Sequence, residues 1–199
     1  MNTKKLADDI RRLATNDKID HDGWLKRMQS DWPACRAAAD ILRKTGSEED
    51  TKALVFFANF VFEKEAKAWS HMGDEKDIEY RRKEISACEK ALEINPAHAA
   101  CLNNQGITYI QLEEWPPAIS CFERAIAAPH GYNPEQAHES YYENVIAKAW
   151  ANLAVSRWNN KDFEEALTAI EEAVKRDSSN KETQEYMRNH MPYRKVTLG

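Results

Sequence analysis

The amino-acid sequence predicts an all-α protein, arranged as an α-solenoid of about three stacked helical hairpins. Apolar residues recur at helical spacing along most of the chain. Its 199 residues include only six glycines and seven prolines, which is sparse for an all-β protein with many turns. A helical pattern also returns three times after Gly73, and such repetition is typical of solenoids. We expect an N-terminal helical extension before the hairpins and a C-terminal capping helix after them.

Charge and cysteine usage narrow the classes of partner. The formal net charge is −5, and residues 1–46 carry ten Lys and Arg against seven Asp and Glu. No basic stripe of the kind that follows phosphates is present, so we expect no nucleic acid partner. The four cysteines form no CxxC pair and no zinc spacing with histidine, so we expect buried thiols in a reducing cytosol, no metal and no cofactor.

Residues 1–46 form the predicted N-terminal helical extension or cap. Leu6, Ile10 and Leu13 follow the i, i+4, i+7 spacing of a helix with one apolar stripe. A second helix is predicted from an N-cap at Asp31, with proline in its first turn, to a stop at Gly46. Whether this region is a degenerate hairpin or a simple cap stays open.

The sequence predicts neither a signal peptide nor a membrane-spanning segment. The N-terminus has no apolar core of a signal peptide. The longest apolar run, between Ala53 and Phe62, is interrupted by Asn59 and is too short to span a bilayer. These features predict a cytoplasmic protein without membrane insertion.

Residues 47–96 are expected to form an irregular hairpin. Ser47 and Asp50 resemble a capping box, and the helix that they open is long and aromatic and ends near Met72. Pro96 closes the second helix of this unit.

The second helices of the hairpins share one pattern of small residues. Two positions, seven residues apart, recur in all three helices, and an alanine occupies them in every case but one. The matching residues are Ala91, Ala125 and Ala173 at one position, and Glu84, Ala118 and Ala166 at the other. Small residues at fixed positions indicate where two helices approach closely.

The helices that precede them also match in the last two units. The matched pairs are Leu102 with Trp150, Gln105 with Leu153, Gly106 with Ala154, and Trp115 with Phe163. A hairpin of this kind cannot bury its apolar face alone and must stack on its neighbours.

These motifs resemble the tetratricopeptide repeat (TPR), whose signature is W-x2-L-G-x2-Y, then A-x3-F, then P, over about 34 residues. Residues 97–130 retain the Gly, Tyr, Ala and Phe of that signature, whereas residues 147–180 retain the Trp, Leu and Ala. The resemblance implies a TPR at 97–130, another at 147–180, and a degenerate TPR-like hairpin at 47–96.

The two repeats are separated by an insertion. Gly106 and Ala154 are 48 residues apart, about 14 more than the usual repeat. We interpret residues 131–146 as a loop followed by an extension of the first helix of the next unit. Inserted segments often sit at a binding face, and a passive extension is an equal alternative. Residues 181–199 are expected to supply a polar capping helix and a tail.

The sequence contains no pattern that predicts catalysis. No HExxH, GxSxG, GxGxxG or P-loop motif occurs, and no two histidines share the i, i+4 spacing of metal ligands on one helical face. Adjacent glutamates such as Glu113 and Glu114 lie on one predicted helix instead of across a cleft. We therefore expect a protein that is not an enzyme.

The resemblance implies that the first helices of the hairpins line a concave groove that holds a peptide or partner protein. By motif position, the groove residues would be Asn103, Asn104, Ile107, Ile110, Gln111, Lys148, Ala151, Asn152, Val155, Trp158 and Asn159. Amides can bond a peptide backbone, Trp158 can accept an apolar side chain, and Lys148 can meet a carboxylate.

Some relatives of this family hold the acidic C-terminus of a chaperone in a carboxylate clamp. Asn104 and Lys148 match two clamp positions, but Asn152 stands where the clamp has an arginine. Because a bidentate arginine is not replaced by an amide, a chaperone tail is the weaker interpretation.

We predict an interaction scaffold or adaptor that binds a peptide or partner protein in this groove. One alternative is a self-assembling structural protein, with a homo-oligomer formed through the N-terminal helices or the insertion. Another is a dedicated chaperone for a secreted or membrane client. The fold class does not decide among them.

Overall fold

The computed structural model describes residues 2–13, 21–72, 77–129 and 139–176, and every regular element within them is a helix. In chain order the elements are α1 (Thr3–Leu13), α2 (His21–Ser30), α3 (Trp32–Thr45), α4 (Glu48–Val61), the π-helical turn η1 (Phe62–Ala66), α5 (Lys67–Met72), α6 (Ile78–Ile94), α7 (Ala99–Gln111), α8 (Trp115–Ala127), α9 (Glu139–Asn159) and α10 (Phe163–Arg176). None of these helices is long and apolar enough to cross a membrane.

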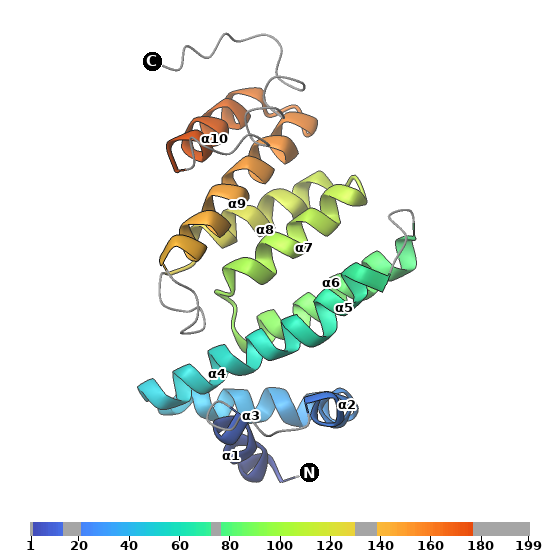
Figure 1. Cartoon of the computed structure of the whole chain (residues 1–199), viewed down its shortest axis with the longest axis vertical. Coiled ribbons are helices and arrows are strands. Elements are labelled where there is room, and N and C mark those ends of the chain that lie inside the picture. Colours follow the sequence, from blue (N-terminus) through green and yellow to red (C-terminus); the bar gives the residue numbers. More distant parts are fainter. Residues whose placement is uncertain (1, 14–20, 73–76, 130–138, 177–199) are drawn as a thin grey trace.

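The helices stack along one long axis, with α1–α3 at one end and α10 at the other (Figure 1). Helices α7 and α8 form one hairpin and α9 and α10 form the next, while α9 also packs on both α7 and α8. The continuous segment α4–η1–α5 pairs with α6 to form the hairpin before them. The predicted α-solenoid is therefore confirmed.

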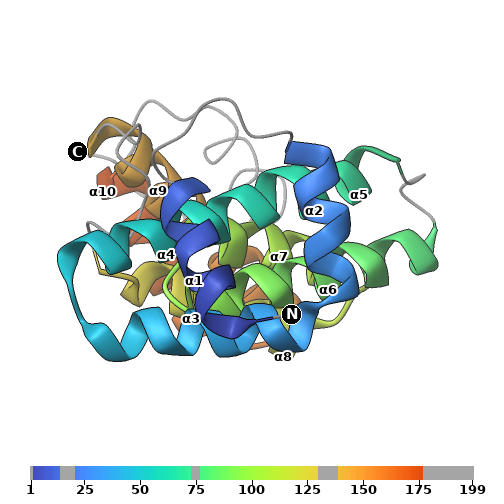
Figure 2. The ribbon, with the colours of Figure 1, turned by 90° about the horizontal axis from the view of Figure 1, so that it is seen from below.

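The N-terminal helices continue the same arrangement. Helix α1 packs against both α3 and α4 (Figure 2), just as α7 packs against both α8 and α9. Its predicted apolar stripe, formed by Leu6, Ile10 and Leu13, is fully buried in the main core. Helices α1 and α3 thus act as a degenerate hairpin, with α2 between them in the chain.

The ends of α3 and the start of α4 agree with the predicted caps, with one exception. Gly46 ends α3 in the left-handed conformation with φ of 63°, and the Ser47 hydroxyl accepts a hydrogen bond from the Asp50 backbone N–H at 3.1 Å. Asp31 precedes α3 as expected, but its side chain makes no capping hydrogen bond. Its backbone carbonyl instead accepts bonds from Ala34 and Cys35.

The predicted long aromatic helix contains an irregularity that its sequence does not reveal. A π-helical turn interrupts it at residues 62–66, where the Lys67 backbone N–H bonds to the Phe62 carbonyl. Such a turn inserts an extra residue and so rotates the following helix face. Phe62, Glu65 and Ala66 are buried within this turn.

The two C-terminal hairpins share the same turn. Glu113 and Lys161 both have positive φ, 57° and 72°, in the turns that follow α7 and α9. The next residue closes each turn, since Glu114 N–H bonds to the Tyr109 carbonyl and Asp162 N–H bonds to the Arg157 carbonyl. The turns lie 48 residues apart (161 − 113), the spacing expected from Gly106 and Ala154.

Gly106 occupies the expected point of close helix approach. A Cβ atom built there would lie 2.6 Å from two ring carbons of Phe122 on α8. Ala154 and Ile170 hold the matching positions in α9 and α10, and both are buried. Where the first helix of the hairpin carries Ala154 in place of Gly106, the second helix therefore carries the smaller Ile170 in place of Phe122.

Part of the predicted insertion is a structural extension of α9. Val145 and Ile146 pack in a second apolar cluster with Ala99 and Ala128, near the start of α7 and the end of α8. Residues 131–138 of the insertion, and the capping helix predicted at 181–199, lie outside the described residues.

Candidate functional site

Helices α7 and α9 lie side by side and present the face predicted to bind a partner. The predicted groove residues on this face differ in their exposure. Gln111, Lys148 and Asn159 are exposed, whereas Asn104, Ile107, Ile110, Ala151, Asn152, Val155 and Trp158 are half-buried. Their mixture of amides and apolar groups is typical of a surface that accepts a peptide.

Asn103 is the exception among the predicted groove residues. Only 7% of its surface is exposed, and its side-chain oxygen accepts a hydrogen bond from Nδ2 of Asn152 at 3.2 Å. This bond joins α7 to α9. Asn103 thus positions Asn152 and the two helices, and it is not open to a ligand as the motif position implies.

The C-terminal end of the face is formed around Trp158. Its ring meets Phe163 edge-on, with centroids 4.9 Å apart, across the turn between α9 and α10. The amide of Asn159 donates to the Val155 carbonyl at 2.8 Å. The half-buried indole leaves an apolar surface beside exposed polar groups, an arrangement suited to an apolar side chain of a peptide.

Lys148 supplies the positive charge of the face. It is exposed and has no ion-pair partner among the described residues. Lys67, which lies on the preceding hairpin, is instead held by Glu63 at 2.6 Å and lies over the Phe62 ring. The face therefore offers one unpaired lysine to a carboxylate.

His98, at the N-terminus of α7, is a structural residue. Its Nδ1 accepts a hydrogen bond from the Cys101 backbone N–H at 3.3 Å, and its ring packs against Phe62. Burial lowers the pKa of His98 to about 4, so the ring is neutral at pH 7. His98 therefore serves as the N-cap of α7.

The described residues offer no group of three or more His, Cys, Asp and Glu side chains suited to a metal ion. Burial raises the pKa of Cys121 to about 11 and that of Cys35 to about 11, which makes both thiols poor nucleophiles at neutral pH.

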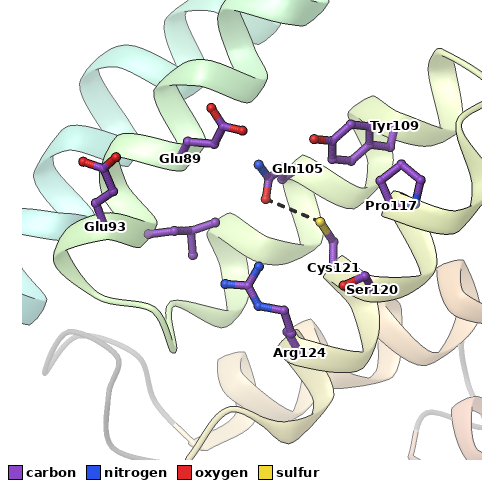
Figure 3. Close-up of a pocket in the computed structure, with 9 residues that line it drawn as sticks. Glu89, Glu93, Gln105, Tyr109, Pro117, Ser120, Cys121 and Arg124 are labelled. Atoms are coloured by element: carbon purple, nitrogen blue, oxygen red, sulfur yellow. Dashed lines mark hydrogen bonds between the residues drawn. The ribbon is translucent and has the colours of Figure 1, made fainter.

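A pocket of about 470 Å³ lies on another part of the molecule and was not found by sequence reasoning (Figure 3). Its walls come from α6, α7 and α8. The lining residues are Glu89, Leu92, Glu93, Gln105, Tyr109, Pro117, Ser120, Cys121 and Arg124. They come from three helices and share no motif, so no linear pattern marks them.

Residues 147–180 match the family model of the tetratricopeptide repeat, which is the second repeat expected from the sequence. No curated protein sequence matches the chain.

Solved structures also resemble this fold. The first TPR of Spaghetti (RPAP3), bound to the HSP90 peptide SRMEEVD, has a TM-score of 0.52 and 17% sequence identity, covering 68% of this chain and 90% of that chain. The NMR structure of the first TPR domain of human RPAP3 gives the same values. The crystal structure of MamA covers 94% of both chains, with a TM-score of 0.41 and 15% identity. The RPAP3 structures show that the fold is that of TPR domains.

Proposed function

We propose that this tetratricopeptide-repeat protein is a binding adaptor that holds a peptide segment of a partner protein along the face of α7 and α9. The observation that carries the proposal is the continuous strip of half-buried amides and apolar side chains on two adjacent helices. In this proposal, the amides of Asn104 and Asn152 bond an extended peptide backbone, and Ile107, Val155 and Trp158 cover its apolar side chains.

The general role agrees with the structural resemblance, since the RPAP3 domain is bound to a peptide. The side chains favour a different peptide for this chain. The position where the clamp has an arginine holds Asn152, whose amide is already bonded to Asn103, and Lys148 is an unpaired cation of the face. We propose a mainly neutral and apolar peptide, with at most one carboxylate near Lys148.

None of the four cysteines forms a disulfide in the described structure and all four are buried, which suits a reducing compartment. We therefore propose that the protein binds its partner in the cytoplasm.

The test is a pull-down from native lysate that compares wild type with Asn104→Ala/Lys148→Ala/Trp158→Ala, with bound proteins identified by mass spectrometry. A matched control carries Glu164→Ala/Thr168→Ala/Glu171→Ala, three exposed changes on α10. Thermal unfolding establishes that both variants are folded.

A partner lost only from the groove variant supports the proposal. A partner retained by both variants contradicts it and moves the binding surface elsewhere. Recovery of no protein except further copies of this chain supports self-assembly instead, and light scattering then gives the number of copies.

A further inference from the structure

The pocket between α6 and α8 lies on the opposite side of α7 from the proposed groove. Gln105 and Tyr109 of α7 line the pocket, whereas Ile107 belongs to the groove. Successive helix residues are about 100° apart, so residues two positions from Ile107 point roughly the other way. A ligand in this pocket therefore does not compete for the groove, and the inference goes beyond the proposed function.

The two walls of the pocket carry opposite charges. Glu89 and Glu93 extend from α6, and Arg124 extends from α8 toward the space between them (Figure 3). Leu92 and the Tyr109 ring add apolar surface. A volume of about 470 Å³ lies within the range of small-ligand pockets.

Glu89 and Arg124 have no hydrogen-bond or ion-pair partner among the described residues. Glu93 differs, because its carboxylate accepts a hydrogen bond from the Trp32 ring N–H at 2.8 Å and lies 3.6 Å from Arg36. Arg82, also on α6, is paired with Glu114. One free carboxylate and one free guanidinium thus face the same pocket.

The charges of Glu89 and Arg124 both influence the Cys121 thiol, which lines the pocket. The Cys121 thiol, which donates to the Gln105 side chain at 3.4 Å, has a pKa raised by burial. The Arg124 charge opposes that rise and the Glu89 charge adds to it, so both lie close enough to be felt there.

We propose that this pocket binds a short peptide segment that carries one cationic and one anionic side chain, the cation against Glu89 and the carboxylate against Arg124. A lysine at Glu89 also approaches the Tyr109 ring, which favours a cation. Arg124 offers two parallel N–H donors to a carboxylate. A ligand with a single charge forms an ion pair with only one of these two side chains.

The experiment uses the full-length, ¹⁵N-labelled protein and three tripeptides blocked at both ends: Lys-Ala-Glu, Gln-Ala-Glu and Lys-Ala-Gln. Backbone amide shifts are followed during titration to about 10 mM peptide, the range suited to weak sites. We expect shifts in α6 and α8 with Lys-Ala-Glu and a dissociation constant about three- to fivefold larger for each singly charged peptide, as for partly exposed ion pairs.

Two variants assign the charges. Glu89→Gln is expected to bind Lys-Ala-Glu and Gln-Ala-Glu equally, and Arg124→Gln is expected to bind Lys-Ala-Glu and Lys-Ala-Gln equally. Both side chains are exposed, so unchanged thermal unfolding is the control for folding. The groove variant Lys148→Ala is expected to bind all three peptides as wild type does.

Shifts confined to α7 and α9, equal affinity of wild type for the three peptides, or an absence of shifts at about 10 mM would overturn the proposal. Because the groove is tested separately by the pull-down, failure of one proposal leaves the other standing.

Discussion

The hairpin formed by α4–α6 and the two that follow it fill the same packing position in different ways. Ala118 and Ala166 occupy this position in α8 and α10 and are fully buried. Glu84 occupies it in α6, only 4% exposed, with its carboxylate 3.3 Å from Arg81. The same packing position in this solenoid is thus filled either by a small side chain or by one member of a buried charge pair.

The difference has an energetic consequence. Burial raises the pKa of Glu84, and bonds with Thr108 and Arg81 offset part of that rise. Nε of Arg81 has no hydrogen-bond partner in the described structure. A buried ion pair with an unsatisfied donor contributes little net stability, but loss of one partner is costly. At this position the α4–α6 hairpin therefore depends on a specific charged partner, whereas the two hairpins that follow depend on the small size of alanine.

The largest expected effect comes from Glu84→Ala, which copies the alanine of the later hairpins but leaves the Arg81 charge buried and unpaired. We expect a loss of about 3–5 kcal/mol in the free energy of unfolding, measured by urea denaturation. The double variant Arg81→Met/Glu84→Ala removes both charges and should recover most of this loss. Equal stability of Glu84→Ala and wild type would contradict the comparison.

The next effect concerns the pair formed by Gly106 and Phe122. Gly106→Ala brings a methyl group to 2.6 Å from the Phe122 ring, so overpacking should cost about 1–3 kcal/mol, and Gly106→Leu more. Gly106→Ala/Phe122→Ile recreates the Ala154 and Ile170 pair of the next hairpin and should be more stable than Gly106→Ala alone. An unchanged melting temperature for Gly106→Leu would refute the repeat alignment.

A smaller effect depends on pH and on the N-terminal hairpin. Arg11 bonds to Asp50 at 2.5 Å and, with Thr45 and Ser47, lowers the pKa of Asp50 from 3.8 to about 2. The stability that this interaction contributes is present above about pH 4. It is lost as the pH falls toward 2, because the Asp50 carboxylate then takes up a proton in the folded state.

Asp50→Asn should therefore lower stability by about 1 kcal/mol at pH 7 and flatten the decline of stability between about pH 4 and pH 2. Urea denaturation at several pH values measures both effects, with Asp40→Asn as the exposed control. The same pH slope in wild type and Asp50→Asn would show that Asp50 does not link α1 to α4.

The smallest effect on stability is expected from Lys148→Ala. The side chain is exposed and unpaired in the described structure, so its removal should change the free energy of unfolding by less than about 0.5 kcal/mol. Partner capture should nevertheless fall. A large loss of stability would instead show that Lys148 supports the fold.

The repeat part of the fold was predictable because its signals are local. Gly106, Ala118 and Phe122 mark close approach and the volume that fills it, and Gly46 and Ser47 mark helix ends by backbone chemistry. The π-helical turn at residues 62–66 was not predictable, because the same residues suit an ordinary α-helix and tertiary packing decides between them.

The candidate site was predictable only in outline. Motif spacing identified the helices that face each other, but the burial of Asn103 depends on its bond to Asn152, 49 residues away. The pocket depends on side chains from α6, α7 and α8 and has no sequence signature. The exposure and pairing of charged side chains depend on tertiary contacts, so motif spacing in the sequence does not predict them.

The most direct test of the central claim places a benzophenone amino acid at Gln111, an exposed residue of the α7 and α9 face, and irradiates the protein in native lysate. The control places the same group at Glu171, an exposed residue of α10. We predict a cross-linked partner from position 111 that disappears when Asn104→Ala and Lys148→Ala are added. The same cross-linked proteins from both positions, or from position 111 with and without those substitutions, would contradict binding on this face.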